Sequence, residues 1–153
     1  MPIFSLFSKI ASNYDLANRV LSLGMDIGWR KTLVGWSRRF KPDAERILDL
    51  ACGTGDVVKE AKKVFPKGVR YIGLDPCGEM LNIARKRLDG EIPLVRGVAE
   101  NLPFKEGVFD VVFISFGLRN FSDRKKALGE IYRVLKPGGV VSVLEFTKPV
   151  GKN

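Results

Sequence analysis

From Arg46 onward, short apolar runs alternate with segments of helical periodicity, and this alternation limits the possible folds more than any other feature. Runs at 47–51, 69–75, 92–97, 109–116 and 140–146 predict five strands, with helices at 56–65, 78–88 and 122–135. Strands joined by helices pair in parallel through right-handed crossovers. The sequence therefore predicts an α/β fold with a doubly wound, mostly parallel sheet, which binds ligands at the carboxyl ends of its strands.

The last of these helices has the clearest predicted boundaries. Ser122 is the expected N-cap, and Leu128, Ile131 and Leu135 form the expected inner face. The run 136–139, Lys-Pro-Gly-Gly, is expected to separate this helix from the fifth strand.

Residues 1–42 precede the alternating pattern and predict a helical appendage on the substrate side, with the core at 43–153. Apolar residues from Phe7 to Ala17 recur at helical spacing, and Trp29, Leu33, Trp36 and Phe40 do so in a second segment. This second segment is basic and aromatic, so it can pack on the sheet or lie at an anionic membrane surface. Packing on the sheet is the favoured alternative.

The composition excludes several classes of protein. The 153 residues contain no histidine, which removes His-based catalysis and His-ligated metals, and two cysteines give no disulfide framework. We expect no metal site. No signal peptide or membrane span is recognisable, so we expect a cytoplasmic protein. The net charge of +9 is spread along the chain and serves solubility or anionic partners equally well. No nucleic-acid module is recognisable, so we expect no nucleic-acid partner.

The turn after the first strand, Asp49-Leu-Ala-Cys-Gly-Thr-Gly-Asp56, predicts a ligand site. Gly53 and Gly55 let the backbone turn sharply and approach a ligand, although glycines of this kind also occur in purely structural turns. The turn matches neither dinucleotide nor P-loop fingerprints. Its two aspartates suit a cationic ligand better than a diphosphate.

Asp75 ends the second strand, 20 positions after Gly55, where an acidic residue hydrogen-bonds ribose hydroxyls. Alone, it could equally be a solvated strand end. Together with the glycine turn it indicates a nucleoside, and S-adenosylmethionine is the nucleoside that carries positive charge in place of phosphate. The sequence therefore predicts S-adenosylmethionine as cofactor and S-adenosylhomocysteine as its product.

Longer motifs resemble one family, the ubiquinone/menaquinone-biosynthesis C-methyltransferases. They are KIASNYDLANRVLSLGMDIGWR, DLACGTGD, GLDPCGEML, AENLPFKEGVFDVVFISFGLRNF and ALGEIYRVLKPGGVVSVLEFTKP, which together run from about residue 7 to residue 149. The glycine turn is shared by class I methyltransferases in general, whereas FGLRN and the leading motif are narrower. The resemblance implies a Rossmann-like class I methyltransferase fold and C-methylation of a polyprenylated benzoquinol or naphthoquinol.

The resemblance also implies cofactor contacts at particular positions. Thr54 would lie in the turn, Asp75 on the ribose, Val98 and Ala99 near the adenine, and Ser115 on the fourth strand. Family members usually carry aspartate or asparagine in place of Val98, which can pack against the adenine but cannot hydrogen-bond its amino group. We expect this difference to weaken binding by about 0.5–1.5 kcal/mol. The expected cofactor-binding set is Asp49, Gly53, Thr54, Gly55, Asp75, Val98, Ala99 and Ser115.

The expected catalytic residues are Arg119, Asn120 and Tyr14, with Asp15 as a further candidate. A phenolate must form next to the methylated carbon, and Arg119 can stabilise it while Asn120 orients a water molecule. The alternatives are a surface ion pair for Arg119 and a core aromatic for Tyr14. Cys52 and Cys77 are expected to pack, since methyl transfer from a sulfonium needs no thiol nucleophile.

The resemblance also implies that the chain is short. The sheet of class I methyltransferases is expected to have seven strands, and the last two have no counterpart in this sequence. The fifth strand would then be an open edge, which proteins normally cover. We expect a homo-oligomer or a complementing C-terminal segment, a lipophilic quinol substrate, and peripheral contact at the inner face of the membrane. Methylation of another small molecule, a non-catalytic S-adenosylmethionine-binding module, and an RNA-modifying enzyme are the alternatives.

Overall fold

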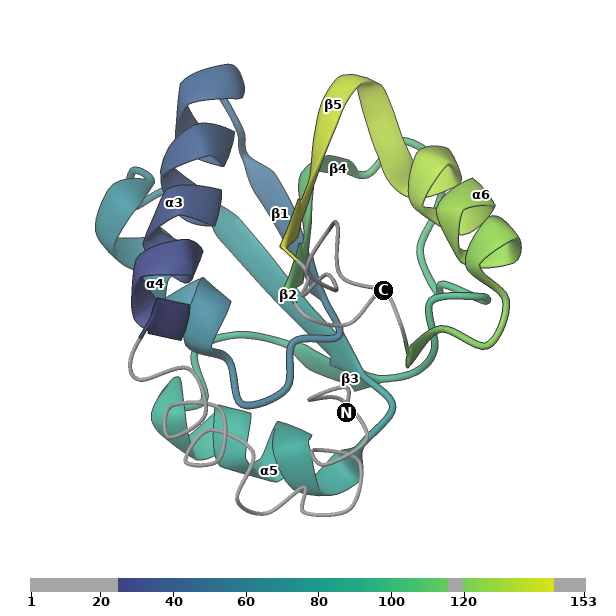
Figure 1. Cartoon of the computed structure of the whole chain (residues 1–153), viewed down its shortest axis with the longest axis horizontal. Coiled ribbons are helices and arrows are strands. Elements are labelled where there is room, and N and C mark those ends of the chain that lie inside the picture. The colour runs from purple at the N-terminus through teal and green to yellow at the C-terminus, as the bar shows by residue number, and fades with distance from the viewer. Residues whose placement is uncertain (1–24, 116–119, 145–153) are drawn as a thin grey trace, which may run out of the picture.

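The computed structural model describes residues 25–115 and 120–144, and Figure 1 shows their arrangement. The elements are α3 (Met25–Phe40), β1 (Arg46–Leu50), α4 (Asp56–Val64), β2 (Arg70–Asp75), α5 (Gly78–Arg87), β3 (Leu94–Arg96), β4 (Phe109–Ser115), α6 (Arg124–Val134) and β5 (Leu135–Leu144). The expected helix around residues 7–17 lies outside the described residues.

The five strands form one parallel sheet in the order β3-β2-β1-β4-β5. After β1 the chain moves outward through β2 to β3, then returns to the other side of β1 with β4 and continues to β5. The order therefore reverses between β1 and β4, which is the switch point where such sheets bind ligands. The predicted doubly wound α/β fold is confirmed.

Helices cover both faces of this sheet (Figure 1). On one face α3, α4 and α5 contribute to a core that includes Val34, Val58 and Ala84, all essentially inaccessible to solvent. On the other face α6 packs through Ala127 and Ile131. The strands between the two layers are apolar on both sides, as buried parallel strands require.

The predicted boundaries of α6 are wrong by one residue. Asp123 is the N-cap, and its carboxylate accepts a hydrogen bond from the N–H of Lys126 at 3.1 Å. An aspartate caps at least as well as a serine, so the helix begins one residue later than predicted. Its inner face shifts accordingly to Ala127, Ile131 and Val134, and Leu128 is exposed.

The fifth strand begins at Leu135 and not at residue 140. Leu135 is the register partner of Phe109, and the ladder is interrupted before Val140 pairs with Val111. Gly138, with φ of +82°, lies in this irregularity, so the Pro-Gly-Gly run distorts the strand without ending it. Residues 145 and 146 of the predicted strand lie outside the described residues.

The start of β5 is tied to the amino edge of the sheet by Asp110. Its carboxylate accepts hydrogen bonds from the N–H groups of Glu45 and Arg46 at 2.9 and 3.0 Å, and Lys136 lies 3.5 Å away. Burial alone would raise the pKa of Asp110, but these partners together lower it below its ordinary value.

Helix α3 packs on the sheet, which was the favoured alternative for this segment. Leu33 and Val34 join the core, and the hydroxyl groups of Ser37 and Ser142 lie 2.6 Å apart across the contact with β5. Trp36 and Phe40 stack on one another and remain more than half exposed. Among the described helices, none is long and apolar enough to cross a membrane.

Candidate cofactor site

The turn between β1 and α4 has an unusual backbone. Ala51, Gly53 and Gly55 have φ of +60°, +54° and +85°, the left-handed region that favours glycine. The N–H of Cys52 donates to the carbonyl of Leu74 at 3.0 Å, which ties the turn to the end of β2. The predicted glycine turn therefore lies at the carboxyl ends of the strands, beside the switch point.

Gly55 is also required by its surroundings. A Cβ atom on Gly55 would lie 2.9 Å from Cδ1 of Leu88 and 3.5 Å from Cβ of Ala84. Helix α5 thus packs directly against this glycine. Because Gly55 is also the N-cap of α4, the close packing sets where that helix begins.

Asp75 lies beside the turn, as predicted, but its carboxylate already holds backbone groups. One oxygen accepts the N–H of Gly53 at 2.9 Å, and the other accepts the N–H of Cys77 at 2.8 Å. Burial raises the pKa of Asp75, and these two hydrogen bonds oppose the rise. A carboxylate has about four acceptor positions, so two remain for a ligand.

Asp49 is almost completely buried beneath the turn. Its Oδ2 atom finds no hydrogen-bond partner in the described part of the chain. Burial, followed by the charges of Asp75 and Asp56, raises the pKa of Asp49 well above its ordinary value, and Arg30 opposes this rise. A buried carboxylate in such surroundings is stabilised by a nearby positive charge. A cation bound near the turn would stabilise the ionised form of Asp49, so this buried carboxyl group favours a cationic ligand over an anionic one.

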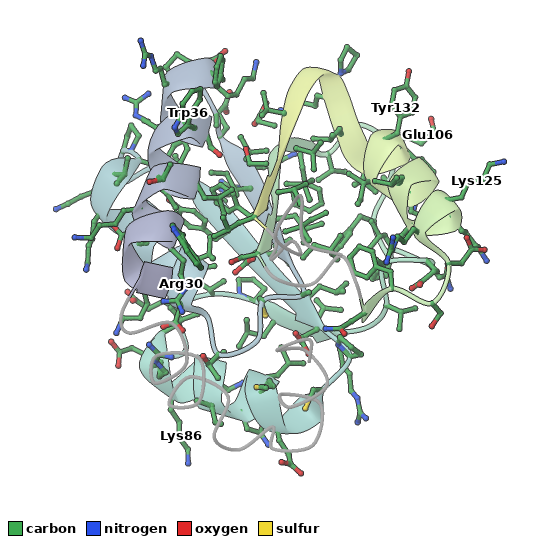
Figure 2. The ribbon with its side chains drawn as sticks, in the orientation of Figure 1. Arg30, Trp36, Lys86, Glu106, Lys125 and Tyr132 are labelled. Atoms are coloured by element: carbon green, nitrogen blue, oxygen red, sulfur yellow. The ribbon has the colours of Figure 1, made fainter. Side chains whose placement is uncertain are left out.

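Asp56, the first residue of α4, is held by two arginines that the sequence did not single out as site residues. Arg30 of α3 places Nη2 3.6 Å from Asp56 Oδ2, and Arg87 of α5 forms an ion pair with Asp56 Oδ1. Arg87 also donates to Thr54 Oγ1 at 2.9 Å. Figure 2 labels Arg30 near the beginning of α3, on the side of the molecule where α4 and α5 lie.

The remaining expected cofactor residues have different surroundings. Val98 follows β3 and is about half exposed, whereas Ala99 is buried. The N–H of Gly97 donates to the carbonyl of Asp75 at 3.2 Å, so this loop lies next to the ribose candidate. Ser115 ends β4 and is half-buried. The structure thus brings the carboxyl ends of β2, β3 and β4 together around the turn.

Most of the expected catalytic residues are not among the residues that the structure describes. Tyr14, Asp15 and Arg119 lie outside the described residues, while Asn120 is described and exposed. Their catalytic roles stay predictions. Ser115, the last described residue before Arg119 in the sequence, ends β4.

Cys52 packs inside the sheet and does not present a nucleophile. Burial, with added repulsion from Asp49 and Asp75, raises the pKa of the Cys52 thiol. Its Sγ would lie 3.0 Å from a Cβ atom added at Gly73, which shows how tightly it packs. Cys77 is partly exposed and not disulfide-bonded. Within residues 25–115 and 120–144, no group of three or more histidine, cysteine or carboxylate side chains is placed to hold a metal ion.

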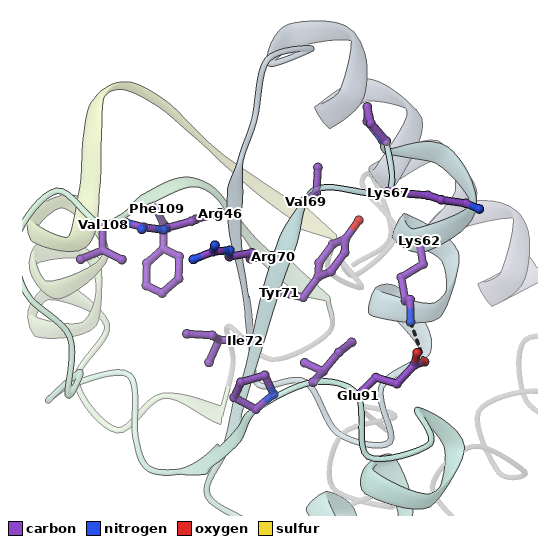
Figure 3. A pocket seen from close by; sticks show the side chains of 13 residues that line it. Arg46, Lys62, Lys67, Val69, Arg70, Tyr71, Ile72, Glu91, Val108 and Phe109 are labelled. Carbon is purple, nitrogen blue, oxygen red and sulfur yellow. Dashed lines mark hydrogen bonds and ion pairs between the residues drawn. The ribbon is translucent and has the colours of Figure 1, made fainter.

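A hollow of about 750 Å³ lies at the opposite, amino edge of the sheet (Figure 3). Arg46 and Arg70, register partners on β1 and β2, line it together with apolar side chains, and Lys62 forms an ion pair with Glu91 at 2.9 Å. Among the described residues the hydroxyl of Tyr71 finds no hydrogen-bond partner, and it is closed off from solvent. None of the expected cofactor residues lines this hollow.

A shallower groove of about 380 Å³ runs between α3 and β5. It is lined by Trp29, Trp36 and Phe40 on the helix and by residues 140–144 on the strand. β5 is the edge strand of the described sheet, and its Val141 and Val143 are exposed. An apolar groove beside an unpaired strand edge is a surface that proteins usually cover.

Comparison with known proteins agrees with this geometry. The solved structure of DesVI from Streptomyces venezuelae superposes with a TM-score of 0.73 at 30% identity, covering 94% of this chain and 60% of that chain. The parallel order, the glycine turn and Asp75 together define a class I methyltransferase fold. The model of the ubiE/COQ5 methyltransferase family matches residues 2–152. The chain belongs to the ubiE/COQ5 methyltransferase family.

Two curated relatives make the family match more specific. Demethylmenaquinone methyltransferase from Thermus thermophilus is 48% identical over 147 residues, covering 94% of this chain and 66% of the relative. Ubiquinone/menaquinone biosynthesis C-methyltransferase UbiE from Wigglesworthia glossinidia brevipalpis is 40% identical over 153 residues, covering 97% of this chain and 60% of the relative. The chain thus spans less than two thirds of the length of these relatives.

Proposed function

We propose that this chain forms the cofactor-binding part of an enzyme that methylates a ring carbon of a polyprenylated benzoquinol or naphthoquinol, using S-adenosylmethionine. The observation that carries the proposal is the acidic glycine turn, in which the buried Asp49 favours a positive charge and Asp75 adjoins the turn with acceptor positions to spare. Relatives named as quinone-biosynthesis methyltransferases supply the substrate class.

Different residues at the site bind different parts of the cofactor. Asp75 accepts hydrogen bonds from the ribose hydroxyls through its remaining lone pairs. Val98, exposed beside it, packs against the adenine ring, and Ala99 forms the wall behind. When bound, the cofactor supplies an electrophilic methyl group on a positively charged sulfur. Thr54 supports the turn, because its hydroxyl already accepts from Arg87.

Catalysis requires a carbon nucleophile held in line with the methyl group. Arg119, four residues beyond the end of β4, stabilises the phenolate that makes the adjacent ring carbon nucleophilic. Arg119 remains charged at all ordinary pH values, so it holds negative charge and does not remove the proton itself. Asn120 orients the water molecule that takes the proton, and Tyr14 of the leading segment is a further candidate for handling that proton.

We also propose that the edge of β5 pairs with another strand, supplied by a C-terminal segment or by a second copy of the chain. Exposed valines support this proposal, as does an apolar groove next to a strand edge that no other described strand pairs. The aromatic and basic surface of α3, next to the groove, is the candidate for peripheral contact with a membrane that holds the quinol.

Methyl transfer from labelled S-adenosylmethionine to a demethylated quinol tests the function. We expect product when the β5 edge is covered by a paired strand, and little or none when that edge is left open. A complemented enzyme that binds S-adenosylmethionine and methylates other small molecules, but never the quinol, would overturn the substrate assignment. Binding without any turnover in the complemented enzyme would favour the non-catalytic alternative.

A further inference from the structure

Arg30 has an unusual position for a residue of the leading segment. It belongs to α3, yet its side chain is only 8% exposed and its guanidinium approaches Asp56 at the start of α4. Arginine is rarely buried without a charged partner, because removing its charge from water is costly. The contact therefore links α3 directly to the cofactor turn.

A second guanidinium, from a different helix, reaches the same carboxylate. Arg87 comes from the last turn of α5 and binds both Asp56 and the hydroxyl of Thr54. Asp56 is itself 89% buried at the side chain, since only 11% is exposed. Three helices thus meet at one carboxylate.

The location of this cluster matters because it holds both chain neighbours of Gly55. Gly55, between Thr54 and Asp56, has a left-handed φ and, as the N-cap of α4, offers no side chain to the free N–H groups of the helix. The two arginines hold the residues on either side of Gly55. They therefore fix the backbone that a nucleoside ligand would approach.

We propose that Arg30 is a positioning residue for the cofactor, which holds the glycine turn through Asp56 and couples helix α3 to cofactor binding. This inference rests on the proposed function, because it takes the turn to be the S-adenosylmethionine site. Arg30 touches neither the cofactor nor the substrate in this account. It acts through Asp56 and through its charge.

The charge of Arg30 also reaches Asp49. Among the described residues, the titratable groups that face Asp49 are Asp75 from β2, Asp56 from α4 and Arg30 from α3, with Cys52 in the turn itself. Of these, Arg30 alone lowers the pKa of Asp49, and Arg87 is paired with Asp56. Removing Arg30 raises the pKa of Asp49 further, so Asp49 loses its charge at a higher pH and attracts a cation less.

The test measures S-adenosylmethionine affinity by calorimetry across the acidic and neutral pH range. Arg30→Gln should weaken binding by about tenfold, the usual scale for one lost charge-assisted contact. The pH at which binding weakens on acidification should move upward. Arg30→Lys should keep that pH close to the wild-type value, because the charge remains. Arg39→Gln is the matched control, since Arg39 is exposed on the same helix.

Two further measurements separate positioning from general stability. Because Arg30 acts in part through Asp56, the double variant with Asp56→Asn should lose less affinity than the two single losses added together. Carboxyl NMR titration of the ligand-free protein should show a higher pKa for Asp49 in Arg30→Gln. Equal affinity in Arg30→Gln and Arg39→Gln, or fully additive losses, would overturn the inference. If the wild-type chain binds no S-adenosylmethionine while Arg30→Gln still raises the pKa of Asp49, the proposed function is overturned instead.

Discussion

Replacing Gly55 with alanine adds a methyl group at the tightest point of the cofactor turn. The backbone there has φ of +85°, which costs a residue with a Cβ atom about 1–2 kcal/mol. The new Cβ would also lie 2.9 Å from Cδ1 of Leu88, and overpacking of this kind typically costs about 1–3 kcal/mol. We expect Gly55→Ala to lose about 2–5 kcal/mol of unfolding free energy.

Urea and thermal unfolding measure this loss, and Gly138 provides a matched control. Gly138 has φ of +82°, but a Cβ atom there would meet no atom of the described residues within 4 Å. Gly138→Ala should therefore show the backbone cost alone, about 1–2 kcal/mol. For a domain of this size each kcal/mol lowers Tm by about 2–4 °C.

The contact with Leu88 can be tested separately. Leu88→Val removes the atom that the new methyl group approaches, so Gly55→Ala and Leu88→Val together should cost less than their separate effects added. If Gly55→Ala is no more destabilising than Gly138→Ala and shows no coupling to Leu88, then the packing of α5 against the turn is not what requires glycine here.

Four other variants test separate parts of the account. The pKa of Asp110 is lowered on folding, so its contribution to stability is present above its unfolded pKa and is lost as the pH falls through the folded value. Asp110→Asn should therefore destabilise the protein at pH 7 and much less near pH 3, as measured by urea unfolding. Val98→Asn should tighten S-adenosylmethionine binding by up to about tenfold in calorimetry, by supplying a partner to the adenine amino group. Val143→Lys should reduce self-association measured by light scattering, whereas Val64→Lys, at an exposed valine of α4, should not. Arg119→Lys should lower turnover of the complemented enzyme with little change in cofactor affinity, because the planar guanidinium is lost; an equal loss of affinity would assign Arg119 to binding.

The sheet and the glycine turn were predictable because their signals are local. Each strand is a short apolar run, and the spacing from Gly55 to Asp75 is set by one helix and one strand, so sequence distance fixes spatial distance. The edge of the sheet at which Asp75 and Val98 lie then follows from parallel pairing.

The contacts of Arg30 and Arg87 with Asp56 were not predictable in the same way. Arg30 lies 26 positions before Asp56, and the contact depends on the angle at which α3 packs on α4 and β5. Arg87 sits in a run of basic residues that resembles a solvated helix face. The start of α6 was misassigned because Ser122 and Asp123 are both good caps, and only the structure shows which one accepts from the N–H of Lys126.

Whether this turn binds the methyl donor is decided by calorimetric titration with S-adenosylmethionine. NAD serves as the competing nucleotide, and Asp75→Asn and Asp43→Asn serve as the two variants. The account predicts that the wild-type chain binds S-adenosylmethionine in preference to NAD, because the turn is acidic. It also predicts that Asp75→Asn weakens binding by about tenfold to a hundredfold while the exposed Asp43→Asn leaves it unchanged. Preferential binding of NAD, or equal S-adenosylmethionine affinity in the two variants, would contradict the assignment of this turn as the methyl-donor site.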